Sequence, residues 1–452
     1  MLKDPGMSCA HAYVPEEGHE GIFSVDMSSL TYGRGAILEI GHLAKSLDCK
    51  RVAVFTEPHI RKLDTFQRGL AALKSAGLDG VVFDEVHIEP TDRSFQHAAD
   101  FAKSTKFDGF VSIGGGSVID SCKAAILYST YPADFFAYVN KPVGEGVPVP
   151  GALPPHIACP TTCGTGAEMT GIAVFDLLER GFKTGIASRR LRPAYAVVDP
   201  DFTRSLPGGV VASSGFDVLA HAIESFTARP YVKRAKSATP ADRPMSQGRN
   251  PWSDVGAKEA LRLSGEFIVR AVNDANDEEA RGQMMWAATL AGLAFGNAGV
   301  HVPHAMAYGV AGLAFQRSHG ATPSGAGKFA MHGYDPAPLV PHGVSVISSA
   351  PAAFRFTASA SPERHLEAAR ALGADSVEVA DADVGVFLSR HLEKMMAATK
   401  VPVNLRAIGY ALEDAVLLTK GTSPQRRLLD NSPRAVADAE LEEIFKDALD
   451  AA

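Results

Sequence analysis

Cysteine is scarce in this sequence, and the few copies form no recognisable framework. Five cysteines are present, at positions 9, 49, 122, 159 and 163. Their odd number and the lack of CxxC spacing argue against a disulfide scaffold and against a thiolate zinc site. The sequence therefore predicts a protein from a reducing compartment.

Long apolar runs are also missing. The most apolar stretches are interrupted by Gly, Pro or His before they reach the roughly 20 residues that cross a bilayer. The first residues, MLKDPGMSCAHAYVPEEGHEG, contain neither the apolar core of a signal peptide nor the Arg-rich pattern of a transit peptide. We therefore expect a cytoplasmic protein with no membrane partner.

An excess of positive charge is absent as well. The 44 Lys and Arg residues are outnumbered by 51 Asp and Glu residues, which gives a net charge of −7. Such a chain has no electrostatic footprint for a nucleic-acid backbone. The 452 residues, of which 46% are hydrophobic and 21% are charged, predict a globular protein of more than one domain.

The first two hundred residues alternate short strand patterns with helical ones. Strand patterns at 51–56, 80–86 and 109–113 are separated by helical patterns near 65–75 and 94–104. This βαβ order predicts a parallel sheet. We therefore expect an α/β domain over residues 1–205.

From about Pro207 the strand pattern disappears. Long segments rich in Ala, Leu and Glu follow, at 253–273, 277–294, 362–372 and 437–449. We therefore expect an all-helical domain over residues 206–452. Two stretches rich in Pro or Gly interrupt it, at 228–251 and 316–341, and loops of that length are often functional.

A glycine cluster follows the strand pattern at 109–113. In FVSIGGGSVIDSCKAA, the residues Gly114, Gly115, Gly116 and Ser117 stand between this strand and a helix that opens near Val118. Glycine lets the backbone approach a bound group, and the unpaired N–H groups at a helix start attract phosphate. The segment suits a dinucleotide pyrophosphate, although a tight strand-to-helix turn has the same composition.

A second cluster, PTTCGTGAEMTGIAVF at 160–175, offers the hydroxyls of Thr161, Thr162 and Thr165 beside flexible backbone. These hydroxyls can bond a phosphate or a nicotinamide amide, or they can simply close a hairpin turn. Glu57, at the end of the first strand pattern, can accept hydrogen bonds from the diol of an adenosine ribose or be an ordinary surface residue. Together the two segments favour a dinucleotide site in the first domain.

The helical half contains side chains suited to a metal. In GFDVLAHAIES, Asp217 and His221 are four residues apart, so a helix places both on one face. In GNAGVHVPHAMAY, the side chains of His301, His304 and Tyr308 stand among small apolar residues, where a bare imidazole needs a partner. Each pattern alone also fits an exposed ion pair or a core histidine bonded to a carbonyl.

A further histidine, His342 in LVPHGVSVISSAP, follows a proline at a predicted helix start. With it, the chain offers one carboxylate and three imidazoles, which suit Fe²⁺ or Zn²⁺ better than Ca²⁺ or Mg²⁺. We predict that the ligands of this divalent metal are Asp217, His221, His304 and His342.

In their order along the chain, these motifs resemble those of the iron-containing, group III alcohol dehydrogenases, which share a fold with dehydroquinate synthase and glycerol dehydrogenase. The resemblance runs through TYGRGA at 31–36, GGGSVID, PTTCGTGAEMT, VVDP at 197–200, GFDVLAHAIES, NPWSD at 250–254, HAMAY and PHGVSV. It implies a dehydroquinate synthase-like fold: an α/β dinucleotide-binding domain followed by an all-α, metal-binding catalytic domain. It also implies the same four metal ligands, with Fe²⁺ as the metal and Zn²⁺ as the alternative.

The resemblance further implies a nicotinamide cofactor. The family's cofactor contacts carry over onto Glu57, Gly115, Gly116, Ser117, Asp120, Thr161, Thr162, Thr165 and Lys183. Glu57 and Glu89 stand where the family often has Asp and Asn. Because an acidic side chain at Glu57 would repel a 2′-phosphate, we expect NAD rather than NADP.

Tyr308 departs from the family pattern, because many members have a second histidine four residues after the ligand that matches His304. That histidine is usually given a proton-relay role. The hydroxyl of Tyr308 or the ring of His301 is the predicted catalytic replacement.

Two other departures from the family pattern make this sequence resemble one branch of the family, the hydroxyacid–oxoacid transhydrogenases. They are the insert at 228–251 and the long stretch between His304 and His342. In that branch a 4-hydroxy acid such as 4-hydroxybutyrate is oxidised, the hydride is held on bound NAD, and a 2-oxo acid such as 2-oxoglutarate is then reduced. A carboxylate substrate needs a cationic anchor. The insert offers Lys233, Arg234, Lys236, Arg243 and Arg249, each of which also fits plain surface solvation.

The predicted protein is therefore a metal-dependent alcohol dehydrogenase that transfers hydride between an alcohol or hydroxy acid and NAD. Its expected partners are a small-molecule substrate and further copies of the chain, in a dimer or larger oligomer. Two alternatives stay open: a dehydroquinate synthase or glycerol dehydrogenase-type enzyme of the same fold, and a non-catalytic metal-binding protein. The latter would have no use for GGGSVID and PTTCGTG.

Overall fold

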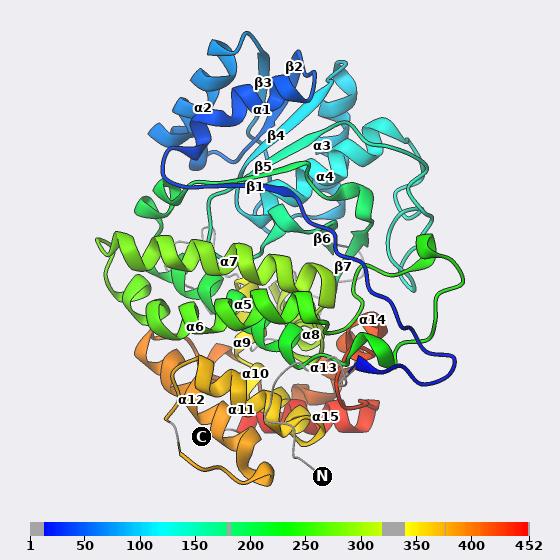
Figure 1. Ribbon diagram of the computed structural model, residues 1–452, viewed down its shortest axis with the longest axis vertical. Coiled ribbons are helices and arrows are strands. Elements are labelled where there is room, and N and C mark those ends of the chain that lie inside the picture. Colours follow the sequence, from blue (N-terminus) through cyan, green and yellow to red (C-terminus); the bar gives the residue numbers. More distant parts are fainter. Residues whose placement is uncertain (1–12, 179–181, 319–339, 376, 451–452) are drawn as a thin grey trace. The chain divides into compact units, whose positions relative to one another are not determined.

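The computed structural model describes residues 13–178, 182–318, 340–375 and 377–450 (Figure 1). Their contacts define two compact units. One lies within Asp26–Leu206, and the other is formed by the described residues of Met1–Val25 and Pro207–Ala452. The division into domains of residues 1–205 and 206–452 stays a prediction.

The unit of Asp26–Leu206 is built on a six-stranded sheet with the strand order β1-β8-β5-β4-β2-β3, in which all neighbouring strands are parallel. The predicted parallel α/β fold is confirmed. The strands are β1 (Ser29–Tyr32), β2 (Arg51–Phe55), β3 (Asp79–Phe83), β4 (Gly109–Gly114), β5 (His156–Pro160) and β8 (Tyr195–Val198). A separate antiparallel hairpin consists of β6 (Ile172–Leu177) and β7 (Phe182–Ala187).

Helices cover both faces of the sheet. They are α1 (Ile40–Ser46), α2 (Asp64–Ser75), α3 (Asp92–Ser104) and α4 (Gly116–Thr130). Successive residues of a strand point to opposite faces. In β2, Val54 belongs to the core that contains Phe66 of α2, whereas Phe55 belongs to the core that contains Val118 of α4. Strands buried on both faces need continuous apolar runs, which is why these strands are conspicuous in the sequence.

The order of the strands reverses between β2 and β4. From β2 the chain passes to β3 on one side, and then to β4, β5 and β8 on the other. In open parallel sheets, ligands bind outside the carboxyl ends of the strands at such a switch point. Glu57 follows β2 and Gly115 follows β4, so two of the predicted cofactor residues flank this position.

The second unit is helical in its described residues, which confirms the predicted all-helical half. Helices α5, α6 and α7 pack against one another, α9 packs on α5, and α8 packs on α13. The helices are α5 (Gly208–Thr227), α6 (Pro251–Asn273), α7 (Glu278–Ala298), α8 (Val302–Ser318), α9 (His342–Ile347), α10 (Ala350–Thr357), α11 (Pro362–Ala371), α12 (Val384–Ala398), α13 (Ala415–Thr422), α14 (Arg426–Leu429) and α15 (Asp438–Asp450). None of the described helices is long and apolar enough to span a membrane.

The insert at 228–251 is mostly irregular and packs against the residues that precede Asp26. Tyr13 stacks on Tyr231 with ring centroids 5.4 Å apart, and Phe23 meets Tyr231 edge-on. Buried Glu20 forms ion pairs with Arg234 and Arg243 of the insert. The insert is therefore held by aromatic and ionic contacts. The other predicted loop, 316–341, lies mostly outside the described residues.

Candidate metal and dinucleotide sites

One face of α5 supplies the first two predicted metal ligands. Asp217 and His221 lie one turn apart, both are at least 96% buried, and His221 Nδ1 is 3.8 Å from Asp217 Oδ2. Phe295 of α7 lies flat on the His221 ring, with the ring centroids 4.0 Å apart and the planes at 8°. The stacked phenyl ring fixes the imidazole and excludes water from one of its faces.

The third predicted ligand comes from α8. His304 Nε2 lies 3.3 Å from Asp217 Oδ1, and the His304 ring stacks on that of His221 with centroids 4.4 Å apart. One ligand atom from each of these three residues lies within 4.8 Å of the others. Residues far apart in the sequence thus converge on a volume that one ion could occupy.

The fourth predicted ligand, His342, is the first residue of α9. Its Nε2 lies 3.7 Å from Asp217 Oδ1, and its ring centroid is 5.5 Å from that of His304. The His342 side chain is 25% exposed, whereas those of Asp217 and His304 are almost fully buried. Solvent therefore reaches the cluster most readily beside His342.

The cluster leaves several buried polar atoms without hydrogen-bond partners. They are Asp217 Oδ1, His221 Nδ1 and His304 Nε2. Such atoms are costly to bury unpaired, and a cation among them would satisfy all three. Imidazole nitrogen and carboxylate oxygen are donors that first-row divalent metals accept. The residues present therefore fit a metal of the predicted type.

The electrostatics of the cluster also favour a cation. Burial by itself raises the pKa of Asp217, but the imidazoles of His221, His342 and His304 outweigh burial and lower it. Burial lowers the pKa of His221 to about 3, so this ring is neutral. Burial also opposes protonation of His304, but Glu224 and Asp217 raise the pKa of His304 to about 10. A metal that binds His304 therefore displaces a proton.

Glu224 is a residue of this region that sequence reasoning missed. Its side chain is fully buried on α5 and contacts His304 Nδ1. It also accepts hydrogen bonds from the backbone N–H groups of His301 and His304, at 2.9 and 3.2 Å. The available signal was its position in HAIES, three residues after His221 and hence on the same helical face.

The two predicted proton-relay residues have different surroundings. The His301 ring is completely buried, with Nε2 3.0 Å from Thr227 Oγ1 and its plane nearly perpendicular to the Phe354 ring. Burial lowers the pKa of His301 to about 4. Tyr308 is 6% exposed and lies one turn after His304 on α8. A catalytic role for either residue stays a prediction.

The two segments predicted to bind a dinucleotide pack directly against each other. A Cβ at Gly116 would lie 2.6 Å from Thr165 Cγ2, and one at Gly115 would lie 3.3 Å from Thr162. Only glycine permits this approach at the start of α4. Thr161 Oγ1 is buried there without a hydrogen-bond partner, so the structure brings these residues together beside an unsatisfied hydroxyl.

Other predicted cofactor residues have protein partners. The Glu57 carboxylate accepts backbone N–H groups two and three residues further on, both at 2.8 Å. Ser117 Oγ accepts the backbone N–H of Glu89 at 3.1 Å. Lys183 is buried between Asp176, at 2.9 Å, and Glu89. Their contact with a cofactor stays a prediction.

Asp120 ties α4 to the hairpin. Its Oδ2 accepts the backbone N–H of Val174 at 3.0 Å, and its Oδ1 lies 3.2 Å from Lys123 Nζ. Lys123 is fully buried and donates to the carbonyl oxygens of Ala167 and Ile172 at 2.8 and 2.7 Å. Lys123 therefore joins the helix after the glycine cluster to the segment after β5.

The predicted cationic anchors of the insert are mostly engaged by the residues before Asp26. The pairs are Lys233 with Glu16, Arg234 and Arg243 with Glu20, and Arg249 with the hydroxyl of Tyr13. Glu16 and Glu20 neutralise part of this positive charge, and the tyrosine hydroxyl neutralises none of it. These contacts secure the insert.

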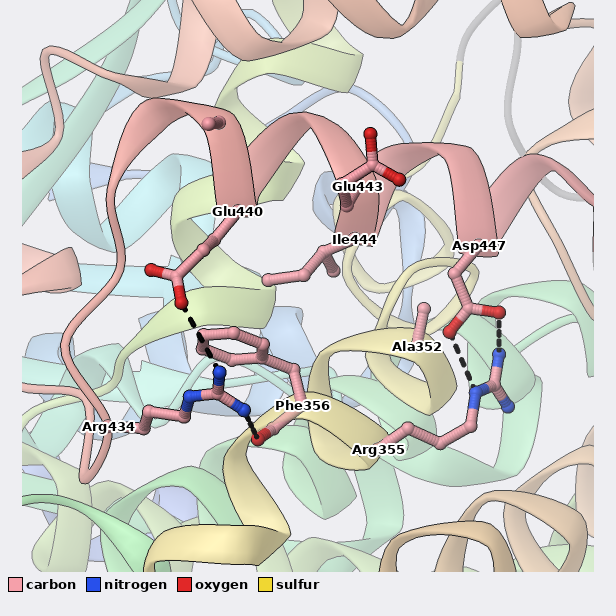
Figure 2. Close-up of a pocket in the computed structure, with 9 residues that line it drawn as sticks. Ala352, Arg355, Phe356, Arg434, Glu440, Glu443, Ile444 and Asp447 are labelled. Atoms are coloured by element: carbon pink, nitrogen blue, oxygen red, sulfur yellow. Dashed lines mark hydrogen bonds and ion pairs between the residues drawn. The ribbon is translucent and has the colours of Figure 1, made fainter.

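A pocket of about 500 Å³ lies between α10 and α15 (Figure 2). Figure 2 shows that both arginines of the pocket have partners within it. Arg355 forms a bidentate ion pair with Asp447. Arg434 contacts Glu440 and the backbone carbonyl oxygen of Phe356. None of the predicted metal or cofactor residues lines it. The pocket is separate from the candidate sites.

Comparisons with known proteins define the class. Residues 28–200 match the family model of iron-containing alcohol dehydrogenases, and residues 244–325 match the model of the C-terminal region of that family. This chain belongs to the iron-containing alcohol dehydrogenase family. The predicted family, the oxidoreductase class and its small-molecule substrate are confirmed.

Within the family, this chain is similar to proteins named hydroxyacid-oxoacid transhydrogenase, mitochondrial. It is 46% identical to the one from Xenopus laevis, over 94% of this chain and 90% of the relative. It is 42% identical to the one from Homo sapiens, over 94% and 89%.

Solved structures share the fold. A 1,3-propanediol oxidoreductase matches with a TM-score of 0.79 at 25% identity, over 94% of this chain and all of that one. An alcohol dehydrogenase from Oenococcus oeni matches with the same TM-score and coverage at 26% identity. The predicted fold class is thereby confirmed.

The prediction of a cytoplasmic protein is wrong. The relatives from Xenopus, Bos taurus and Dictyostelium discoideum are all named as mitochondrial. The prediction depended on the composition of the first residues. Targeting segments are recognised by the import machinery and removed, so the composition of a folded chain constrains its compartment poorly. The four described cysteines are free.

Proposed function

We propose that this chain is a hydroxyacid–oxoacid transhydrogenase. It oxidises a 4-hydroxy acid such as 4-hydroxybutyrate, keeps the hydride on bound NAD, and delivers it to a 2-oxo acid such as 2-oxoglutarate. The similarity to proteins of that name over nearly the full length of both chains supports this proposal. The oxidation releases one hydride and one proton, and the reduction consumes both.

The proposed reaction depends on the metal centre. The observation that carries it is the convergence of three buried donor atoms, from Asp217, His221 and His304, none of which has a hydrogen-bond partner. His342 completes the ligand set on the more exposed side. The metal is Fe²⁺, with Zn²⁺ as the alternative. When bound, such a cation supplies Lewis-acid chemistry that lowers the pKa of an adjacent alcohol.

Neighbouring residues hold the proposed metal ligands in position. Phe295 shields one face of His221, and Glu224 holds His304. The hydroxyl of Tyr308, one turn after His304, relays the alcohol proton to solvent. The ring of His301, the other predicted relay, is completely buried and bonds Thr227.

NAD is bound by the unit that contains the parallel sheet. The N-terminus of α4, with Gly115, Gly116 and Ser117, holds the pyrophosphate, because its free N–H groups and dipole favour an anion. Thr161, Thr162 and Thr165 bond the phosphate or the carboxamide. Glu57 accepts the adenosine ribose diol and disfavours the 2′-phosphate of NADP. The remaining proposed contacts are Asp120 and Lys183.

The chain also works as a homo-oligomer in this proposal. Within the described residues β1 is an edge strand, and edge strands can pair with a strand of a second copy. Light scattering of the purified protein tests this point, and a monomer at micromolar concentration would remove it.

One assay separates the transhydrogenase from a simple NAD-dependent alcohol dehydrogenase, the second candidate that the family suggests. Oxidation of 4-hydroxybutyrate is followed with and without 2-oxoglutarate and without added free NAD. The transhydrogenase requires acceleration by 2-oxoglutarate, and a His304→Ala variant should show none. Ordinary NAD-dependent turnover of a simple alcohol without this acceleration would establish the second candidate instead.

A further inference from the structure

The buried face of α5 carries a second carboxylate besides Asp217. Asp217, His221 and Glu224 follow one another at spacings of four and three residues, so all three project from the same side of the helix. Glu224 is fully buried, without any exposed surface. A charged group in that position requires strong partners, because burying an unpaired carboxylate is costly.

All the partners of Glu224 lie at the start of α8. Its Oε2 contacts the ring Nδ1 of His304, and its Oε1 accepts the backbone N–H groups of His304 and His301 at 3.2 and 2.9 Å. The first N–H groups of a helix have no partner within that helix. One carboxylate therefore holds both the ring and the backbone of a single histidine and caps the helix that carries it.

This arrangement determines which ring nitrogen of His304 is available. Because Nδ1 donates to Glu224, Nε2 is the nitrogen left to face Asp217 Oδ1, 3.3 Å away, and it can bind a metal once its proton is displaced. The ring cannot rotate without losing its bond to the carboxylate. Carboxylate partners of this kind fix the tautomer and orientation of a metal-binding histidine and make the ring a stronger donor.

We propose that Glu224 is a positioning residue for the metal centre, which aims His304 Nε2 at the ion and joins α5 to the start of α8. The inference rests on the proposed ligand set. Glu224 itself does not touch the metal or the substrate. Its contribution appears as metal affinity, in addition to any effect on folding.

The test measures the Kd for Zn²⁺ and Co²⁺ of the full-length, metal-stripped protein by competition with a chelator. Glu224→Gln keeps the size of the side chain and removes its charge, and we expect the Kd to rise about 10- to 100-fold. Glu224→Asp keeps the charge on a shorter side chain and should give an intermediate Kd. The visible spectrum of the Co²⁺ protein should change in both variants, because it reports the geometry of the ligands.

Asp254→Asn is the matched control. Asp254 is also a buried carboxylate of a helix in this unit, and it pairs with Arg364 and Tyr13. Its loss should lower the thermal stability of the metal-free protein and leave the Kd for the metal unchanged. If Glu224→Gln behaved in the same way, Glu224 would be purely structural and the inference would be overturned.

His304→Ala separates this inference from the proposed function. If His304→Ala retains the wild-type Kd, the proposed ligand set is wrong. If His304→Ala loses the metal while Glu224→Gln does not, only the inference about Glu224 is wrong. Should Glu224→Gln fail to fold, Glu224→Asp decides the question, and a wild-type Kd and Co²⁺ spectrum in that variant would overturn the proposal.

Discussion

Gly343 lies so close to the carbonyl oxygen of Ser213 that no side chain fits between them. A Cβ at position 343 would lie 1.9 Å from that oxygen and 3.1 Å from the Cβ of Asp217. Gly343 follows His342 on α9, and Ser213 lies one turn before Asp217 on α5. The close contact of the two helices therefore sets the distance between two of the proposed metal ligands.

Gly343→Ala should push α9 away from α5. We expect a loss of about 1–3 kcal/mol in the free energy of unfolding, as for other overpacked contacts, and a lower metal content. Urea unfolding and elemental analysis measure the two effects. Gly80→Ala is the control, because a Cβ there would meet its nearest neighbour at 3.7 Å. Equal stability and metal content in the two variants would contradict the explanation.

His304→Ala and His342→Ala should each abolish retention of the metal. Each removes one nitrogen donor from a set of four, and the remaining donors cannot hold a divalent ion through gel filtration. Elemental analysis of the purified variants gives the metal content. His97→Ala is the control, since that side chain is 56% exposed on α3. A full complement of metal in either variant would show that the histidine concerned is not a ligand.

His156 should make the protein sensitive to acid. Its ring is buried at the start of β5 and bonds Ser112 at 2.8 Å, and burial lowers the pKa of His156 to about 3. In the unfolded chain the pKa is about 6.5, so the unfolded state takes up the proton first. The stability is therefore complete above pH 6.5 and is lost as the pH falls toward 3.

Between pH 7 and pH 5 this one residue should cost roughly 2 kcal/mol, at about 1.4 kcal/mol for each pH unit below 6.5. Urea unfolding at the two pH values, for the wild type and for His156→Gln, measures it. The variant should lose about 2 kcal/mol less than the wild type over this interval. Identical losses would show that His156 is protonated in the folded protein.

Lys123→Met should weaken NADH binding. The substitution removes the only ammonium group that bonds the carbonyl oxygens of Ala167 and Ile172 in the described structure, so the segment that follows Thr161–Thr165 loses two of its hydrogen bonds to α4. We expect a rise of roughly tenfold in the Kd for NADH, which corresponds to about 1.4 kcal/mol. Fluorescence titration measures it. Lys103→Met, on the exposed side of α3, should bind NADH as the wild type does.

Glu57→Ser should shift the cofactor preference toward NADP. The serine hydroxyl can still bond a ribose oxygen, and the repulsion of a 2′-phosphate disappears. The ratio of kcat/KM for NADP to that for NAD should rise at least about tenfold, or about 1.4 kcal/mol. Glu85→Ser, a change at an exposed carboxylate, should leave the ratio unaltered. No change in Glu57→Ser would remove Glu57 from the ribose site.

The strands that could be predicted from the sequence are those buried on both faces. The runs at 51–56 and 109–113 are continuous and apolar because helices cover β2 and β4 on both sides. At one edge of the sheet β3 is only partly buried, but its Val81, Val82 and Phe83 still pack against these cores. Nothing comparable marks β1, whose four residues SLTY lie at the sheet edge and are exposed or half-buried. β1 is defined by its pairing with β8 more than by its own composition.

The candidate metal site, too, could be predicted from the sequence only in part. The pair Asp217 and His221 can be predicted because helical spacing alone brings them together. Glu224 shares that spacing, but its role depends on the start of α8 lying against it, a relationship to which no local pattern points. The cations of the insert looked available in the sequence, but three of them form ion pairs with Glu16 or Glu20, which precede Asp26.

The sequence by itself determined the α/β and helical halves, the glycine and threonine segments, and the residue types of the metal site, since these depend on periodicity and on the chemistry of side chains. Only the tertiary structure decided which donor atoms meet, which carboxylate orients His304 and which charges are already paired. Those outcomes depend on how α5, α8 and α9 pack. Such contacts join residues far apart in the sequence, as His342 and Asp217 show across 125 positions.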